Sequence, residues 1–359
     1  MNGELRGVQC PGCGAALDVA SEVIGCGACG QAYPRVGGIP VLLPKPDAHL
    51  GLWRGQLGSL LERGQATLAG LQEAAQGDAL SPLTRQRLLA LGEAVQAQVL
   101  DVAAVLDPAL GGPEPGGAGL PRGVVEYIGY LYRDWGWPSA GYVENERALE
   151  ELGKLNQERA LGRTLVLGAG ACGLAYDLHR LCGATQTVVL DVDPYLLVMA
   201  ERVVRGGRLR LTEASLKVME LGDVARSWWL QAPYGPLSPS SFQFLFADGI
   251  EPPFADGCFD SVVTPWFIDQ VPRDLPAFFA RIARLLRPGG RWLNQGPLVY
   301  PEQTPFAQRF SRQELFELAA SAGFAIDGWS VASVPYLVSP LSGHGKVEAV
   351  LSFAASRGA

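Results

Sequence analysis

The sequence lacks the features of a membrane or secreted protein. It has no run of about 18 uninterrupted apolar residues, the length that a membrane-spanning helix needs. Residues 1–9 carry no apolar signal core. We therefore expect a cytoplasmic protein with no membrane partner. Hydrophobic residues make up 48% of the chain and charged residues 18%, which excludes an intrinsically disordered protein.

A basic surplus is also missing. The chain has 29 lysines and arginines against 36 acidic residues, which gives a net charge of −7. The excess of acidic over basic residues is spread along the sequence, since residues 1–120 hold 7 basic and 11 acidic side chains. Proteins that grip nucleic acid by its phosphates usually carry the opposite balance. The charge therefore argues against a nucleic-acid partner and favours a small-molecule or peptide substrate.

The length and the linker signals predict the domain organisation. A chain of 359 residues fits two or three domains. Apolar residues recur at helical spacing from about Leu50 to Ala75 and from Pro82 to Leu106. Residues 107–123 are rich in glycine and proline, which is typical of a linker. We predict an N-terminal module over 1–46, a helical segment over 47–106, the linker over 107–123 and a catalytic domain over 124–359.

Four of the seven cysteines form two closely spaced pairs. They are arranged as two C-x-x-C knuckles separated by twelve residues: Cys10, Cys13, Cys26 and Cys29. Four thiolates at this spacing complete a tetrahedral Zn(II) site with no open position for a substrate, so we expect a structural zinc. The alternative is four free buried cysteines. So short a segment cannot build an adequate core alone, and a metal would stabilise its fold.

The residues after the second knuckle add a family resemblance. The stretch from Tyr33-Pro34 to Gly38-Ile39-Pro40-Val41-Leu42-Leu43 is similar to the ending of the small zinc-ribbon proteins that activate methyltransferases. The resemblance covers about 45 residues and implies a zinc ribbon. The ribbon carries as many basic as acidic residues up to Lys45, which weakens the idea that it grips RNA.

The catalytic half alternates predicted strands and helices, as a doubly wound α/β sheet does. The strand Thr164–Leu167 leads into a G-x-G-x-x-G loop formed by Gly168, Gly170 and Gly173, and a helix follows to Leu181. Glycines in this context let the backbone approach a cofactor at the helix N-terminus. The next strand ends in Asp191, which is placed to accept the ribose hydroxyls of NAD or of S-adenosylmethionine.

Later motifs favour S-adenosylmethionine over NAD. An apolar strand ends in Asp248-Gly249, where an acid commonly meets the adenine amino group in methyltransferases, and a fourth strand ends at Pro265. The sequence Leu285-Leu286-Arg287-Pro288-Gly289-Gly290 precedes a fifth strand, as is frequent in class I methyltransferases. Phe324–Ser333 and Lys346–Ala354 are predicted to form the closing antiparallel hairpin. The ordered set is similar to the class I (Rossmann-like) methyltransferase fold, with S-adenosylmethionine as its cofactor.

Segments outside this core resemble the carnosine N-methyltransferase-like family. They are Tyr130-Leu131-Tyr132-Arg133-Asp134-Trp135, Glu144-Asn145-Glu146-Arg147, Trp266-Phe267-Ile268-Asp269 and Trp292 to Tyr300. The resemblance spans roughly residues 125–355 and implies N-methylation of an imidazole or a similar small nucleophile. By the same analogy, Arg133 would meet the methionine carboxylate of the cofactor, Asp191 the ribose and Asp248 the adenine.

One departure from that family concerns the substrate. The family has a histidine after the tyrosine that corresponds to Tyr300, and here that position is Pro301. The departure puts carnosine itself in doubt as the substrate. Among the three histidines of the chain, His344 precedes the last strand, where the family places substrate contacts. We therefore include His344 among the candidate substrate-binding residues.

The chemistry of imidazole methylation suggests roles for four residues. A neutral imidazole has a pKa near 6.5 and needs no strong base at pH 7, but its far N–H needs an acceptor that fixes the tautomer. Asp269 is our candidate for that acceptor, and its alternative role is a helix N-cap. Tyr300 either lines the pocket or packs. Trp266 and Phe267 are predicted to form an aromatic wall around the methylated group.

Two other functions stay open at the level of sequence. The first is an RNA or protein methyltransferase whose zinc ribbon presents a macromolecule. The second is a cofactor-binding scaffold without catalysis. Residues 209–241, with Trp228-Trp229, form an insertion that either covers the pocket or is a structural excursion.

Overall fold

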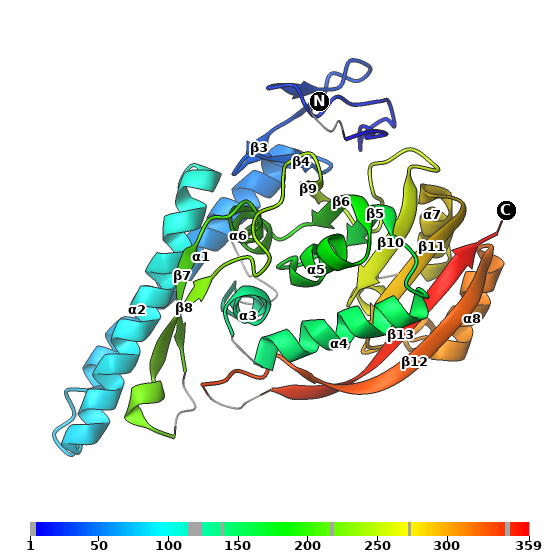
Figure 1. Cartoon of the computed structure of the whole chain (residues 1–359). Helices are drawn as coiled ribbons and strands as arrows, with labels where there is room; N and C mark the ends of the chain where they lie inside the picture. The colour runs from blue at the N-terminus through cyan, green and yellow to red at the C-terminus, as the bar shows by residue number, and fades with distance from the viewer. Residues whose placement is uncertain are drawn as a thin grey trace.

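The computed structural model describes residues 5–113, 124–137, 140–215, 219–271, 274–341 and 345–358. Figure 1 shows a central sheet flanked by helices, with a zinc-ribbon-like module at one end and a long helical hairpin that projects from the side. The module contains β1 (Ile24–Gly25) and β2 (Ala32–Tyr33), which pair antiparallel, followed by β3 (Arg35–Val36) and β4 (Ile39–Leu42).

The helical segment is two antiparallel helices of equal length. These are α1 (Pro46–Ala74) and α2 (Pro82–Leu110), which lie where the helical spacing of apolar residues predicted two helices. Ser81 caps α2 by accepting a hydrogen bond from the Thr84 N–H at 3.1 Å. Close approach of the two helices depends on Gly64, where a Cβ would lie 2.7 Å from Val99.

The predicted start of the linker at residue 107 is wrong by one helical turn. The sequence rule ends the helix near Pro108, but α2 continues to Leu110 and closes on Gly111, whose φ of 77° suits a left-handed cap. Burial explains the extension, because Leu110 is 2% exposed and its carbonyl accepts a hydrogen bond from Arg54 Nε at 2.8 Å. Residues 114–123 lie outside the described residues.

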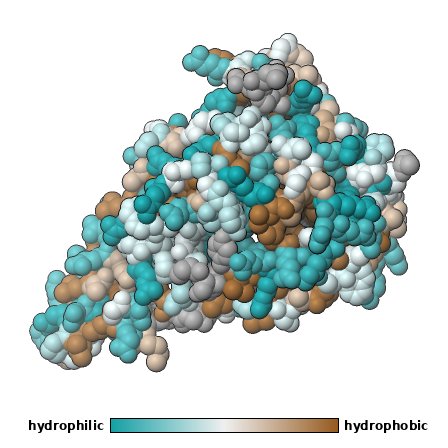
Figure 2. Space-filling view, in the orientation of Figure 1, coloured by the Kyte–Doolittle hydropathy of each residue, from teal (hydrophilic) through white to brown (hydrophobic). Residues whose placement is uncertain are grey.

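By length and composition alone, α2 is apolar enough to cross a membrane. In the structure the same helix packs against α1, against α6 (Pro194–Val204) and against β7 (Leu209–Ala214). Leu83 and Leu89 are exposed toward its free end, and Figure 2 shows apolar and polar surface interspersed there.

Within the described ranges the central sheet has nine strands in the order β12-β13-β11-β10-β5-β6-β9-β4-β3. Its predicted parallel core is confirmed and comprises β5 (Gly162–Leu167), β6 (Ala184–Asp191), β9 (Phe242–Ala247), β10 (Phe259–Pro265) and β11 (Leu286–Gly296). The predicted closing hairpin is β12 (Phe324–Tyr336) with β13 (Lys346–Arg357), and β13 pairs antiparallel with β11. This is the arrangement predicted for a class I methyltransferase sheet.

Both faces of the sheet are buried, which explains the continuous apolar runs of its parallel strands. Alternate side chains divide between two cores: Val166 of β5 faces one, and Leu165 and Leu167 face the other. The first core also contains residues of α1, α2, α3 (Val124–Trp135), α4 (Ala140–Leu155), α5 (Gly173–Leu181) and α6. The second contains residues of the ribbon, α7 (Leu275–Leu285) and α8 (Arg312–Ser321).

The sequence suggested that the ribbon is a separate module. In the structure it is joined to the main sheet. Its last strand extends the main sheet, because β4 pairs parallel with β9 through Val41↔Phe246 and Leu42↔Ala247. A second contact joins Val8 to Phe254 as an antiparallel bridge. The ribbon therefore holds both the end of β9 and the loop that follows it.

Residues 209–214 and 225–230 form a second hairpin beside the main sheet. It consists of β7 and β8 (Ala225–Leu230), which pair antiparallel in a separate two-stranded sheet. The short helical turns η1 (Leu221–Asp223), η2 (Ile268–Gln270) and η3 (Phe306–Gln308) complete the described elements.

Candidate active site and metal centre

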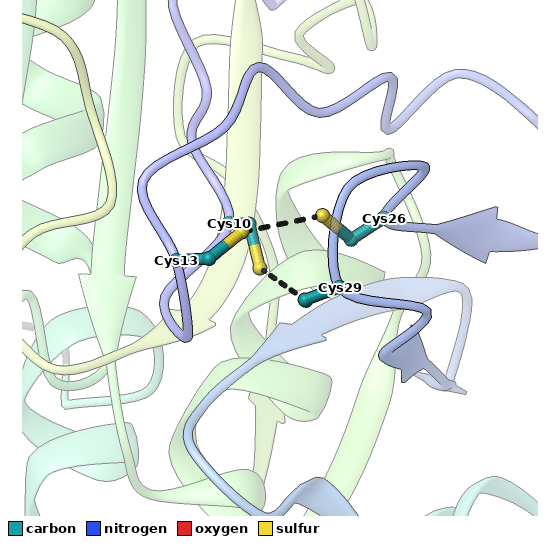
Figure 3. A group of neighbouring side chains, drawn as sticks. All are labelled: Cys10, Cys13, Cys26 and Cys29. Atoms are coloured by element: carbon teal, nitrogen blue, oxygen red, sulfur yellow. Dashed lines mark hydrogen bonds between the residues drawn. The ribbon is translucent and has the colours of Figure 1, made fainter.

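The four predicted metal-binding cysteines converge. Figure 3 shows the two knuckles facing each other, and all four Sγ atoms lie within 4.8 Å of one another. The Sγ atoms of Cys10 and Cys29 are 3.7 Å apart, and those of Cys13 and Cys26 are 3.5 Å apart. A tetrahedron with Zn–S bonds of about 2.3 Å has S···S edges of about 3.8 Å. The geometry thus suits a structural Zn(II), held by Cys10, Cys13, Cys26 and Cys29.

The glycine loop lies between β5 and α5, as predicted. Gly168 and Gly170 have φ of 67° and 54°, a left-handed conformation that glycine adopts without strain, and Gly173 is the first residue of α5. The Gly170 N–H donates a hydrogen bond to Asp191 Oδ2 at 2.7 Å. The predicted ribose-binding acid therefore also fixes the shape of the loop.

Asp191 ends β6 and Asp248 directly follows β9, at the carboxyl ends of two adjacent strands. Asp191 Oδ1 accepts hydrogen bonds from the backbone N–H groups of Val192 and Asp193. Burial raises the pKa of Asp191, and these backbone donors oppose the shift. Asp248 Oδ1 accepts from the Ile250 N–H at 2.8 Å in the turn that leaves β9. Contacts of Asp191 with the ribose and of Asp248 with the adenine remain predictions.

Helix α3 is bonded to the glycine loop. Asp134 Oδ2 accepts a hydrogen bond from the Gly173 N–H at 2.9 Å, and Trp135 Nε1 donates to the Ala171 carbonyl at 2.8 Å. Sequence reasoning quoted Asp134 within a motif but gave it no role. Its partner lies 39 positions away in the chain, so the pairing appears only in the folded structure.

Arg133 lies beside this loop but already has two carboxylate partners. Its Nε is 2.7 Å from Asp134 Oδ1 and its Nη1 is 2.8 Å from Glu144 Oε1. Burial alone would lower the pKa of Arg133, but the two carboxylates raise it. Burial also raises the pKa of Glu144, while Arg133 opposes the shift. A contact between Arg133 and the cofactor carboxylate remains a prediction.

The predicted aromatic wall differs in one of its two members. Phe267 packs against Phe278 and lies over the glycine loop and the end of β9, since a Cβ on Gly168 or Gly249 would lie 2.3 or 2.7 Å from its ring. Phe267 therefore requires glycine at both positions, and its contact with the substrate remains a prediction. The ring that stacks on Trp266 is Tyr336 of β12, which sequence reasoning missed.

Trp266 and Tyr336 stack at the end of β10. Their ring centroids are 4.2 Å apart with an interplanar angle of 25°. Trp266 follows Pro265 with φ of 51°, a left-handed conformation that a bulky residue adopts only where its surroundings hold it. The Tyr336 hydroxyl is 2.6 Å from that of Tyr130, and the Arg133 guanidinium lies over the Tyr130 ring. This aromatic wall adjoins the loop-binding helix α3.

Asp269 is buried one turn beyond this wall. It is 4% exposed, lies within η2, and its Oδ2 accepts a hydrogen bond from the Val299 N–H at 3.3 Å. Burial raises its pKa to about 6, although hydrogen bonds to the carboxylate oppose the shift. The alternative N-cap role is wrong, because Asp274 caps the next helix by accepting from the Ala277 N–H.

Two further candidates have different outcomes. The Tyr300 hydroxyl donates to the Phe310 carbonyl at 3.1 Å, and burial raises the pKa of Tyr300 to about 12. Tyr300 thus has a packing role whatever its part in the pocket. His344 lies outside the described residues, so its predicted substrate contact stays a prediction.

Comparison with known families confirms the resemblance to carnosine N-methyltransferases. Residues 212–342 match the family model described as "Carnosine N-methyltransferase". A carnosine N-methyltransferase from Dictyostelium discoideum is 25% identical over 183 residues, which cover 46% of this chain and 39% of that protein. The match thus spans well under half of the curated relative.

Solved structures of methyltransferases are also similar. Phosphoethanolamine N-methyltransferase 2 of Haemonchus contortus has 17% identity and a TM-score of 0.44, with coverage of 69% of this chain and 62% of that one. A SAM-dependent methyltransferase from Aquifex aeolicus has 13% identity and a TM-score of 0.37, with coverage of 65% and 96%. The sequence similarity to the carnosine N-methyltransferase family lies in residues 212–342, which contain Trp266, Asp269 and Tyr336.

Proposed function

We propose that this protein is an S-adenosylmethionine-dependent methyltransferase that methylates a ring nitrogen of an imidazole-containing small molecule or peptide. The observation that carries the proposal is the position of Asp269. It is a buried carboxylate just beyond the carboxyl end of β10, next in sequence to the turn that presents Trp266, within the segment that matches the carnosine N-methyltransferase model.

The glycine loop and the strand ends fit the cofactor. Gly168 and Gly170 hold the loop in a conformation that keeps side chains away from the backbone, and Asp191 and Asp248 lie at the ends of the two next strands. These residues would hold the nucleoside part, and Arg133 and Pro265 would border the methionine part. S-adenosylmethionine, when bound, supplies a methyl group activated by a positively charged sulfur.

Asp269 would act on the substrate through its far ring N–H. A carboxylate that accepts this hydrogen bond fixes the tautomer and leaves the lone pair of the other ring nitrogen available for attack. Methylation makes the ring cationic, and the ring becomes neutral when the far N–H loses its proton. A carboxylate with a pKa of about 6 is suited to accept that proton near neutral pH.

The aromatic wall would orient the ring before transfer. Trp266 and Tyr336 already stack on each other, so the outer face of one of these rings would bind a flat ring and stabilise a developing positive charge by cation–π attraction. Holding the nucleophile within about 3 Å of the methyl group can supply much of the rate enhancement. Pro301 stands where the family has a histidine, so we expect Asp269 to be the main polar contact to the ring.

A mass-shift screen tests this function. The full-length zinc-loaded protein and S-adenosylmethionine are incubated with imidazole compounds that include carnosine, with unrelated peptides and with total RNA. We expect a gain of about 14 daltons, one CH2, on an imidazole compound. A gain confined to RNA or to peptides without imidazole would favour a macromolecular substrate and overturn the proposal.

A further inference from the structure

The hairpin β7–β8 carries a buried acid that the proposed reaction does not use. The inner face of the hairpin packs in the core, where Leu211 and Leu230 are 1% and 0% exposed. On the same hairpin Glu213 is 8% exposed, although glutamate is rarely buried without a partner. Its carboxylate is therefore expected to have a specific set of hydrogen-bond donors.

Among the described residues, three neutral donors from three different segments bind Glu213. Its Oε2 accepts hydrogen bonds from the indole N–H of Trp137 at 2.9 Å and of Trp228 at 2.7 Å. Its Oε1 accepts from the Ser339 hydroxyl at 2.6 Å. Hydrogen bonds to a charged acceptor are stronger than neutral ones, and a buried carboxylate is costly if they are lost. Glu213 thus connects the end of α3, the hairpin and the loop between β12 and β13.

A second buried acid holds the same loop. Glu144 Oε2 accepts a hydrogen bond from the Leu337 N–H at 3.2 Å, while its Oε1 pairs with Arg133. Leu337 has φ of 51°, which a leucine maintains only where neighbouring contacts enforce it. The Ser339 hydroxyl in turn accepts from the Leu341 N–H. The described start of the loop, Leu337–Leu341, is therefore fixed at two points by carboxylates.

The loop continues directly from the aromatic wall. Tyr336, the last residue of β12, stacks on Trp266, and Leu337 follows it. Figure 1 shows the end of the β12–β13 hairpin beside β7 and β8, on the side of the sheet that carries α3. A displacement at Ser339 would therefore be transmitted to Tyr336 over three residues.

We propose that Glu213 is a positioning residue, which keeps Tyr336 stacked on Trp266 by holding the loop through Ser339. The β7–β8 hairpin is then the support of the acceptor pocket rather than its cover. This inference rests on the proposed function, because it assigns the Trp266–Tyr336 pair to acceptor binding. It also predicts that cofactor binding is independent of the Ser339 contact, since the glycine loop is bonded to Asp134 and Asp191 instead.

The chain offers matched variants for a test. Ser339→Ala removes the contact to the loop alone, and Glu213→Leu removes all three contacts. In Glu213→Gln the amide oxygen can accept from both indoles and the amide N–H can donate to Ser339 Oγ, so the set is preserved. Ser330→Ala is the control, because Ser330 on the same strand donates to Glu151 Oε1 at 2.5 Å, about 20 Å from Tyr336 along an extended strand.

Two measurements on the full-length zinc-loaded protein decide the matter. Hydrogen exchange of residues 337–341 is followed without substrate, and KM for the imidazole compound that the screen identifies is compared with the Kd for S-adenosylmethionine. We expect Ser339→Ala and Glu213→Leu to speed exchange and to raise KM about tenfold, with the cofactor Kd changed less than about twofold. Glu213→Gln and Ser330→Ala should behave as the wild type does.

Different failures have different meanings. Unchanged exchange in Ser339→Ala and Glu213→Leu would overturn the positioning role. Faster exchange with an unchanged KM would show that the loop is held but is not part of the acceptor site, which also overturns it. Failure of Glu213→Gln to restore exchange would count against the hydrogen-bond geometry. If the wild type methylates no imidazole compound, the proposed function itself fails, and the exchange data separate that result from the others.

Discussion

The Asp134 carboxylate accepts a hydrogen bond from the backbone N–H of Gly173, the first residue of α5, at 2.9 Å. A Cβ on Gly173 would lie 2.6 Å from Asp134 Cγ, so the two residues are in tight contact. Helix α3 and the glycine loop therefore form one unit. The conformation of the loop depends on a helix that lies outside the sheet.

Asp134→Asn tests this unit. Asp134 Oδ1 accepts from Arg133 Nε and Asn145 Nδ2 while Oδ2 accepts from Gly173, and an amide must turn a donor toward one of these groups. We expect a loss of about 1–3 kcal/mol in the free energy of unfolding and about tenfold weaker cofactor binding. Denaturant titration and calorimetry measure the two effects.

The matched control is Asp274→Asn. Asp274 caps α7, and asparagine is an equally good N-cap. The free energy of unfolding and the affinity for S-adenosylmethionine should therefore equal the wild-type values within error. If Asp134→Asn left the affinity for S-adenosylmethionine unchanged, the link between α3 and the cofactor loop would be refuted.

We expect Gly168→Ala to destabilise the protein by more than the left-handed backbone at this position alone would explain. The new Cβ would lie 2.3 Å from the Phe267 ring, whereas Gly257 has nearly the same φ, 68° against 67°, and open space around it. We expect Gly257→Ala to cost about 1 kcal/mol and Gly168→Ala about 2–4 kcal/mol of stability. Phe267→Leu combined with Gly168→Ala should recover part of the loss in a double-mutant cycle. Strict additivity of the two changes would contradict the assigned contact.

Asp269→Asn should abolish most turnover and leave cofactor affinity unchanged. The carboxylate is ionised above its pKa of about 6, so wild-type kcat/KM should fall as the pH decreases through 6. The variant should lose the contribution of Asp269 to that acid limb. A pH–rate profile of both proteins measures this, and equal turnover at pH 7.5 would exclude the role.

The raised pKa of Asp269 also predicts an effect of pH on stability. The folded-state pKa of Asp269 is raised above its ordinary value of 3.8, so the ionised carboxylate destabilises the fold above about pH 6 and this penalty decreases as the pH is lowered toward 4. We expect Asp269→Asn to have a higher Tm than the wild type at pH 8, with a smaller difference at pH 5. Thermal melts at the two pH values test the sign.

Loss of one zinc ligand should affect the sheet as well as the ribbon. We expect Cys29→Ser to lower the metal content from about one ion per chain to near zero and to speed hydrogen exchange at Phe246 and Ala247, which pair with β4. Cys182→Ser is the control, since Cys182 is a free cysteine outside the cluster. Full metal content in Cys29→Ser would contradict the four-cysteine site.

The fold was largely predictable because its signals are local. Parallel strands buried on both faces give continuous apolar runs, such as Leu165–Leu167, and the glycines and acids that end them follow at once in the sequence. The two C-x-x-C knuckles fixed the metal site by spacing alone. The pairing of β4 with β9 was not predictable, because a four-residue strand gives no indication of its distant partner.

The site was less predictable because its contacts are long-range. Glu213 and Ser339 are 126 positions apart, and Tyr336 and Tyr130 are 206 apart. Sequence reasoning grouped Trp266 with Phe267, whereas in the structure, with a left-handed conformation at Trp266, the two rings have different neighbours. In β8 Trp228 is buried and Trp229 is exposed, a difference that two adjacent tryptophans do not show in the sequence.

The most direct test of the account is transfer of an isotopically labelled methyl group. The wild-type protein is mixed with S-adenosylmethionine labelled at the methyl carbon and with the imidazole compounds of the screen, and the product is examined by NMR. We predict that the label appears on a ring nitrogen of an imidazole compound, and that the cofactor is consumed in equal amount. Tight binding of S-adenosylmethionine without transfer to any ring nitrogen would contradict the proposed function.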